Sequence, residues 1–266
     1  MPDTRKLRSR IKSVNSTLHL THAMELVASS KIRRATERME ASTDHAGAFT
    51  AAMGLLAGSS ACRESPWLKT RETGKTLLVV IAGDRGLAGG YNANIFRYMR
   101  AWPEAEVIPV GKRACDRYDG ERVQAEGFSP AEAEAITRRL CDAFRSGAYA
   151  RIGVVYTRYV TILSQVPEIR WLLPLTPPEE KPQSDMIFEP SARSILEAAI
   201  PAYITGVLTA CVRESFACEV CARRNAMDSA GKNAREMIDS LQLQYNRARQ
   251  GAITQEITEI VAGGNA

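Results

Sequence analysis

An opening stretch free of helix breakers limits the folds available to this chain, because residues 4–46 contain neither Gly nor Pro. Apolar residues recur within it at steps of three and four, which is the spacing of one helical face. A helix of 40 residues is about 60 Å long, and its stripe cannot be buried against one compact core. We therefore expect a long partner helix. The stripe consists of Leu7, Ile11, Val14, Leu18, Met24, Val27 or Ala28, Ile32, Ala35 and Met39.

The other end of the chain offers this partner. We expect a helix that begins near residues 190–191 and has a kink or break at Pro201, because proline removes a backbone donor and clashes with the preceding turn. A repeat near 3.5 residues per turn favours a left-handed coiled coil, and Ile253, Ile257, Ile260 and Val261 extend the apolar surface. The repeat consists of Met227, Ala230, Ala234, Met237, Leu241, Tyr245, Ala248 and Ala252.

Between these helices the sequence changes to short apolar runs. Their length and β-branched residues are typical of buried strands, and their alternation with helical segments predicts a small, mostly parallel α/β domain. The expected strands are 76–82, 106–110 and 151–156, with 169–174 as a candidate edge strand and helices near 92–101 and 130–145.

The predicted fold is thus an antiparallel left-handed coiled coil of N- and C-terminal helices with an inserted Rossmann-like α/β domain. The expected boundaries are 1–58 for the N-terminal helix, 74–188 for the inserted domain and 190–266 for the C-terminal helix.

Composition restricts the class of protein. No apolar run approaches the roughly 20 residues of a membrane-spanning helix, and the charged N-terminus lacks the apolar core of a secretory signal, so we expect a cytosolic location. The cysteines have no disulfide-scaffold spacing. Cys211, Cys218 and Cys221 share one helical face, where buried thiols are a better interpretation than a metal or redox site. The others are Cys62, Cys115 and Cys141.

Positive charge is concentrated at the start of the chain. Residues 1–40 hold nine Lys or Arg and four Asp or Glu, which accounts for the net charge of +5 of the whole sequence. Such a helix meets nucleic acid, an anionic membrane or an acidic protein surface, or it is simply a solvated face.

Candidates for chemistry are few. Gly83–Asn92 stands between a strand and a helix, where a phosphate-binding loop would lie, but Arg85 occupies the middle glycine position of a dinucleotide fingerprint. Residues 74–76 resemble the end of a P-loop, yet they open a strand. The three histidines, His19, His22 and His45, lie on the first helix without a carboxylate or thiol that completes a metal site. We expect no catalytic, cofactor or metal site.

Four motifs resemble those of the F-type ATP synthase γ subunits. Ala23–Arg34 is similar to the family's N-terminal helix, and Gly83–Asn92 to its D-R-G-L-C-G-G-x-N signature, with alanine replacing the cysteine. Ser164–Pro167 and Leu172–Leu175 are similar to its central region. Tyr245–Gly263 matches the family's C-terminal motif almost throughout. The motifs occur in the family's order over nearly the whole chain.

The resemblance implies a rotary shaft without catalytic activity of its own. The family's terminal helices form an asymmetric coiled coil inside a ring of three α and three β subunits, and rotation driven by the membrane c-ring sets the states of the β subunits. The implied partners are therefore α, β, ε and the c-ring, with one copy of this chain per complex. The implied location is peripheral, on the cytoplasmic face of the inner (plasma) membrane, and the basic helix has a protein partner instead of nucleic acid.

Carried over by position, the resemblance implies two groups of partner-contact residues. Arg249 and Gln250 would contact a loop of the catalytic subunits, with Thr254 and Glu256 close by. The other group would face an acidic segment of β, and it comprises Met24, Lys31, Arg33 and Arg34.

Two departures from the family pattern are Pro201, where the helix is usually continuous, and Asp228, where Lys is common. Two other functions compete with the shaft. A coiled-coil adaptor with a basic arm would bind nucleic acid in a salt-sensitive way, and an enzyme using the Gly83–Gly90 loop would bind a nucleotide alone. The adaptor does not explain the C-terminal motif, and failure of the chain alone to bind ATP or NAD would exclude the enzyme.

Overall fold

The computed structural model describes residues 2–71, 73–177 and 188–263. The chain divides into two compact units. The first combines Met1–Ser29 with Arg223–Ala266, and the second is Ser30–Ala222. Two long helices, α1 (Pro2–Gly58) and α5 (Ala192–Gly263), contribute one end to each unit.

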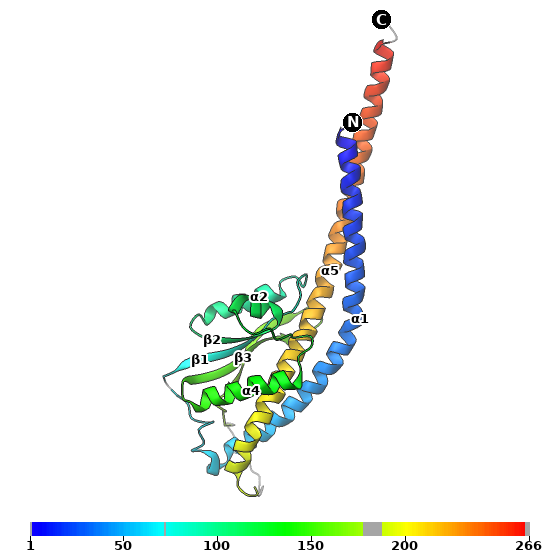
Figure 1. Ribbon diagram of the computed structural model, residues 1–266. Helices are drawn as coiled ribbons and strands as arrows, with labels where there is room; N and C mark the ends of the chain where they lie inside the picture. Colours follow the sequence, from blue (N-terminus) through cyan, green and yellow to red (C-terminus); the bar gives the residue numbers. More distant parts are fainter. Residues whose placement is uncertain (1, 72, 178–187, 264–266) are drawn as a thin grey trace. The chain divides into compact units, whose positions relative to one another are not determined.

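The first unit is an antiparallel pair formed by the start of α1 and the end of α5 (Figure 1). The side of α5 that is buried differs from the expected one, since Gly231 and Ile238 are buried while Met237 is 47% exposed. With Met227, Ala234 and Leu241 these residues alternate in steps of four and three without a slip. This heptad spacing is typical of a left-handed coiled coil. A Cβ at Gly231 would lie 3.7 Å from Thr21 Oγ1, an ordinary contact distance, so Gly231 faces Thr21 across the helix pair.

The C-terminal end of α5 continues past the beginning of α1 (Figure 1). Gly231 lies opposite Thr21, and in an antiparallel register the first residue of α1 then lies opposite about residue 250 of α5. Beyond this point Ile253, Ile257 and Ile260 are exposed. They form an apolar stripe at helical spacing that does not join the buried seam.

The second unit contains a four-stranded sheet in the order β2-β1-β3-β4. Strand β1 pairs in parallel with β2 and β3, and β3 pairs antiparallel with β4, so the prediction of a mostly parallel sheet with an edge strand near 169–174 is confirmed. The strands are β1 (Lys75–Ile81), β2 (Glu106–Val110), β3 (Tyr149–Tyr159) and β4 (Gln165–Leu173).

Helices cover both faces of this sheet. Alternate residues of β1 point to opposite faces: Leu77 and Val79 join a core with α4 and α5, whereas Leu78 and Val80 join one with α2. Because both faces are buried, the strand is continuously apolar. Helix α3 was not foreseen because it is a single short segment. The remaining elements are η1 (Ser60–Cys62), α2 (Tyr91–Tyr98), η2 (Met99–Ala101), α3 (Lys112–Tyr118) and α4 (Pro130–Arg145).

The expected break at Pro201 does not occur, because α5 continues as one α-helix through this residue. Pro201 lies on the exposed side of the helix, while Ile200 and Ile204 are fully buried. The packing of these neighbours holds the helix together, and the carbonyl oxygen that loses its donor is that of Glu197, on an exposed residue. Tertiary packing therefore overrides the local preference.

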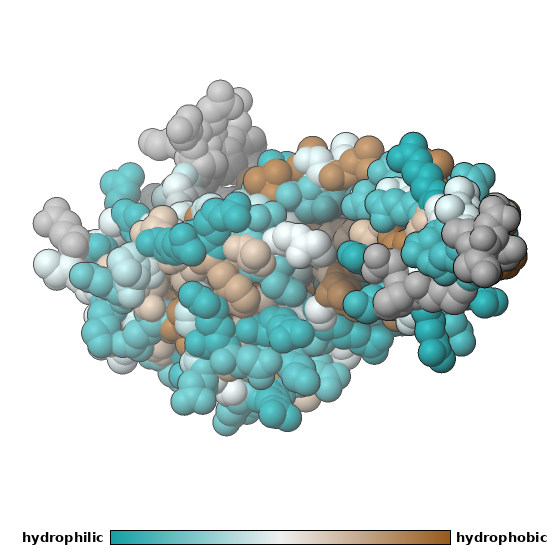
Figure 2. Space-filling model, turned by 90° about the horizontal axis from the view of Figure 1, so that it is seen from above, coloured by the Kyte–Doolittle hydropathy of each residue, from teal (hydrophilic) through white to brown (hydrophobic). Residues whose placement is uncertain are grey.

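One 18-residue window of α5 is long and apolar enough to cross a bilayer by composition, with a mean hydropathy of 1.7. Half of that window is buried inside the protein, and the core helix of a soluble protein passes the same test. The surface seen from above is mostly hydrophilic, with hydrophobic residues in small separate patches (Figure 2).

Candidate functional site

The loop 83–90 between β1 and α2 is held by internal hydrogen bonds. Asp84 accepts backbone hydrogen bonds from Lys112 (2.9 Å) and Ala125 (3.1 Å) on Oδ1 and from Glu126 (2.8 Å) on Oδ2. The Gly83 amide donates to Asn92 Oδ1 at 2.8 Å. The Asp84 carboxylate and the Gly83 amide therefore fix this loop on its own domain.

The same loop packs against α5. A Cβ at Gly83 would lie 2.8 Å from the carboxyl carbon of Glu219, so only glycine permits this approach. Glu219 is 2% exposed, and the hydroxyl of Tyr91 donates to the Ser215 carbonyl at 2.9 Å. Burial of the Tyr91 ring, with the nearby Glu219, raises the pKa of its hydroxyl well above the usual value. The loop 83–90 is thus one part of the α/β domain that packs directly against α5.

The end of β3 is attached to α5 by further hydrogen bonds. The Thr157 amide donates to Ser215 Oγ at 3.0 Å, and the Tyr159 amide donates to Glu214 Oε1 at 2.9 Å. Burial raises the pKa of Glu214, and the hydrogen bond from Tyr159 partly opposes this shift. These bonds satisfy amides at the end of β3, beyond Val155 where its pairing with β1 ends, and they make α5 and the sheet one packed body within the second unit.

Three of the predicted contact residues lie at the start of the second unit. Lys31 is joined to the loop through Glu126, whose carboxylate lies 2.5 Å from Lys31 Nζ and 3.2 Å from Arg85 Nη2. Glu126 thus neutralises part of the local charge. Among the described residues, Arg33 forms an ion pair with Glu37 alone, on its own helix; its side chain is 90% exposed, and Arg34 is also exposed. Arg33 and Arg34 therefore remain available to an acidic partner.

Met24 lies in the first unit, where it is half-buried on α1. It follows Thr21 and precedes Ala28, both buried in the helix pair. Leu20, Leu26 and Val27 are all more than half exposed on the same stretch. Met24, which the resemblance assigns to a partner contact, is thus partly packed in the helix pair and partly open to solvent.

The other four predicted contact residues lie on the end of α5 in the first unit, and all are exposed. Thr254 Oγ1 donates to the Gln250 carbonyl at 3.0 Å, a bond within the helix. In the part of the chain that the structure describes, the side chains of Arg249 and Glu256 form no hydrogen bond or ion pair. Their charges are therefore free to meet another molecule.

The cysteines are buried and free, as expected for the three on α5. Burial raises the pKa of Cys211 to about 12, which keeps the thiol protonated, and the Cys218 thiol donates to the Thr157 carbonyl at 3.4 Å. Residues 2–71, 73–177 and 188–263 contain no group of three or more His, Cys, Asp or Glu that could hold a metal ion.

Sequence reasoning did not identify Glu126 as a partner of Lys31 and Arg85, or Glu219 as the residue that packs against Gly83. Glu126 is 95 residues from Lys31 in the chain, and no local pattern links them. For Glu219 a signal existed, because a charged residue within an otherwise apolar face of α5 requires a specific environment when buried.

Comparison with known proteins gives a consistent result. A family model described as ATP synthase matches residues 3–266. The ATP synthase gamma chain of Ruminococcus albus is 39% identical over 280 residues, covering 98% of this chain and 97% of the relative. The sodium ion specific ATP synthase gamma chain of Acetobacterium woodii is 36% identical over 293 residues, with the same coverage of each chain.

Solved structures show the same fold. A chain of the Euglena gracilis mitochondrial ATP synthase, in rotational state 3, aligns with a TM-score of 0.70 and 17% identity, covering 100% of this chain and 94% of that one. A chain from the central stalk and c-ring of the Tetrahymena thermophila enzyme aligns with a TM-score of 0.64 and 22% identity, covering 79% and 99%.

Proposed function

The chain belongs to the ATP synthase γ-chain family, and on this premise we propose that it is the central rotary shaft of an F-type ATP synthase. As a member of the family it is a non-catalytic subunit of the complex. It transmits torque between an ion-driven membrane c-ring and a catalytic ring of three α and three β subunits. The mechanism is a rigid body that biases alternative conformations of its neighbours through different contacts.

The observation that carries this proposal is the free end of α5. Its exposed apolar stripe of Ile253, Ile257 and Ile260 extends past the described part of α1, and Arg249 lies beside it without an ion pair to any residue that the structure describes. An exposed apolar stripe with unpaired charges is typical of a surface that another protein covers. We assign it to the interior of the α and β ring.

The contact residues follow from this arrangement. We propose that Arg249, Gln250, Thr254 and Glu256 meet a loop of the catalytic subunits. Arg33 and Arg34 face an acidic segment of β, with Met24 and Lys31 in the same contact region. Individual exposed ion pairs are weak, so steric fit supplies most of the coupling.

The remaining parts of the proposal concern the place of the complex. The chain is part of an ATP synthase, which is a membrane-associated assembly. We propose that it occupies the cytoplasmic face of the inner (plasma) membrane, as a single copy, with ε and the c-ring as further partners and without nucleic acid. The domain division 1–58, 74–188 and 190–266 separates the two shaft helices from the domain that meets ε and the c-ring.

The test is an affinity purification of the tagged chain from its host, followed by a double substitution on α5. Recovery of α and β with ATP hydrolysis, while the isolated chain shows none, supports the shaft. Recovery of the chain alone, or with nucleic acid, contradicts it. In membrane vesicles we expect Arg249→Ala with Gln250→Ala to reduce ATP-driven ion pumping severalfold.

A matched control lies on the same helix. Arg235 and Gln242 are also exposed, but they lie within the part of α5 that pairs with α1. The pair Arg235→Ala with Gln242→Ala should leave pumping near the unsubstituted value. Equal loss in both double variants would show that the free end has no special role.

A further inference from the structure

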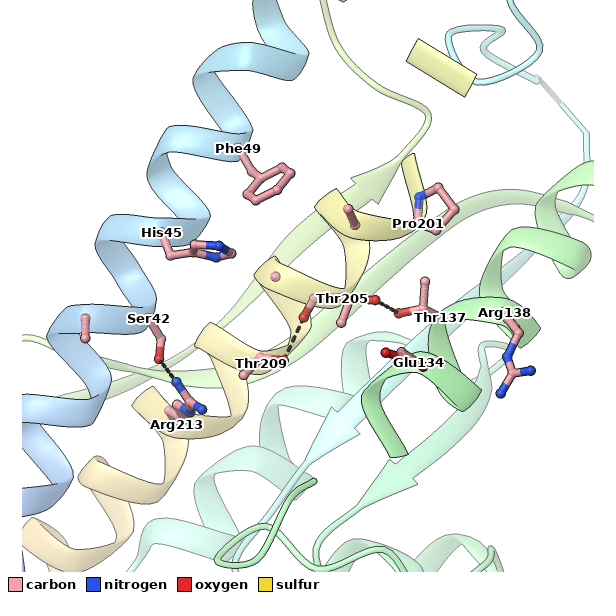
Figure 3. A pocket seen from close by; sticks show the side chains of 13 residues that line it. Ser42, His45, Phe49, Glu134, Thr137, Arg138, Pro201, Thr205, Thr209 and Arg213 are labelled. Atoms are coloured by element: carbon pink, nitrogen blue, oxygen red, sulfur yellow. Dashed lines mark hydrogen bonds between the residues drawn. The ribbon is translucent and has the colours of Figure 1, made fainter. Parts of the chain in front are cut away.

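A groove of about 870 Å³ lies in the second unit between α1, α4 and α5. Ser42, His45 and Phe49 line it from successive turns of α1, and Pro201 and Arg213 mark its extent along α5 (Figure 3). Twelve residues of α5 correspond to about 18 Å. The volume falls in the range of about 300–1,000 Å³ typical of small-molecule sites.

The groove is open because the facing side chains of α5 are small. Gly206 lies opposite α1, and a Cβ there would be 3.7 Å from His45 Nδ1 and 4.0 Å from Phe49 Cδ2. Ala202 and Ala41 contribute only methyl groups to the walls. A larger residue at position 206 would enter the space now empty between the helices.

Hydrogen bonds between the helices hold the walls in place. Thr205 Oγ1 on α5 donates to Thr137 Oγ1 on α4 at 2.9 Å, and Arg213 Nη1 donates to Ser42 Oγ on α1 at 2.5 Å (Figure 3). Both acceptor residues are buried. The groove is therefore preformed, which reduces the entropy that a ligand loses on binding.

Arg213 gives the groove a cationic end. Its guanidinium has five donors, and among the described residues it makes one hydrogen bond, to the neutral hydroxyl of Ser42, and no ion pair. Ser42 Oγ itself donates to the Arg38 carbonyl at 2.7 Å, so the anchor is oriented. The charge of Arg213 is held at the groove without a carboxylate beside it.

The other end of the groove is apolar, with Phe49, Pro201 and Ala202. On the α4 side Glu134 lines the groove, and the guanidinium of Arg138 points away from α1 and α5 (Figure 3). The carboxylate of Glu134 opposes a ligand with several negative charges, such as a nucleotide. A single negative charge and an apolar chain match the two ends.

We propose that this groove binds a small amphipathic carboxylate of the fatty-acid class. The carboxylate pairs with Arg213, and the chain runs along Gly206 toward Phe49 and Pro201. Charge-assisted hydrogen bonds from a guanidinium to a carboxylate are among the strong ones in proteins, and the apolar residues Phe49, Pro201 and Ala202 cover part of the chain at the other end. The site is separate from the surfaces proposed to contact the catalytic ring.

The experiment is calorimetric titration of the purified full-length chain with sodium decanoate. We expect saturable binding, with acetate and decyltrimethylammonium at least about tenfold weaker because they lack the chain and the negative charge, respectively. Arg213→Gln should weaken decanoate binding by on the order of tenfold or more. Absence of decanoate binding up to about 1 mM would overturn the proposal.

The groove itself is tested by a matched pair at one position. Gly206→Leu places a side chain in the space and should abolish binding, while Gly206→Ala adds one methyl group at ordinary contact distance and should retain it. Both changes improve helix propensity, and circular dichroism verifies that both variants are folded before their affinities are compared. Equal affinities of the Leu and Ala variants for decanoate would also overturn the proposal.

Discussion

The close packing of the loop 83–90 against α5 can be tested by Gly83→Ala. The added Cβ would lie 2.8 Å from the carboxyl carbon of Glu219 and 3.0 Å from each carboxylate oxygen. Ordinary contact begins near 3.4 Å, so the loop and the Glu219 side chain must separate by about 0.6 Å. Glu219 is 2% exposed, and its carboxylate cannot swing into solvent without leaving a packed interface.

Overpacking of this kind destabilises a core by about 1–3 kcal/mol. With a urea dependence of about 2 kcal/mol per M, the unfolding midpoint should fall by on the order of 1 M. Tryptophan fluorescence is the suitable probe, because Trp67, Trp102 and Trp171 all lie in the second unit. The transition then reports on that unit even if the helix pair of the first unit unfolds separately.

Two further variants identify the cause. Gly86→Ala is the control on the same loop, because its Cβ would meet the end of the Arg113 side chain at 3.2 Å. This substitution should lower the free energy of unfolding only slightly. In a Glu219→Ala background, Gly83→Ala should cause almost no further loss of unfolding free energy, since the carboxylate that would clash is absent. Additive effects of the two substitutions would refute the reasoning, because a double-mutant cycle measures the direct interaction.

Three other outcomes are expected. Arg33→Ala should leave most ATP-driven ion pumping intact, since the ion pair that the described residues give Arg33 is the exposed one with Glu37, and loss of pumping from this one change would contradict the argument that exposed ion pairs are weak. Pro201→Ala should stabilise the second unit by about 1–3 kcal/mol in urea titrations, because the Glu197 carbonyl regains a helical donor; an unchanged midpoint would contradict this. Native Cys211 should resist iodoacetamide at about pH 9 and react once unfolded, because its pKa is raised to about 12. The stability that its protonated thiol contributes is complete below about pH 8.5 and is lost between there and about pH 12, so Cys211→Ala should flatten the pH dependence of the unfolding midpoint over this range.

The sequence predicted the order and type of most elements because they depend on local spacing. The long helices follow from apolar residues at steps of three and four, and β1 follows from an apolar run that must be buried on both faces. The γ-family resemblance rested on short motifs in order, and the family match over residues 3–266 confirmed it. The contact roles of Arg249, Gln250 and the other proposed residues stay predictions.

What the sequence left open was settled by packing between distant residues. Periodicity alone placed Met237 in the seam, but the partner helix selects Ile238, because adjacent apolar residues differ only in the side of the helix they occupy.

By itself, then, the sequence determined two long helices, a mostly parallel sheet between them and membership of a rotary family. Only the tertiary structure decided that Pro201 is tolerated, that Gly83 lies against Glu219, and that Arg213 lines a groove without forming an ion pair among the described residues. The physical reason is range. Helix and strand periodicity depends on residues a few positions apart, whereas a packing contact, a steric clash or a pocket depends on residues that only folding brings together.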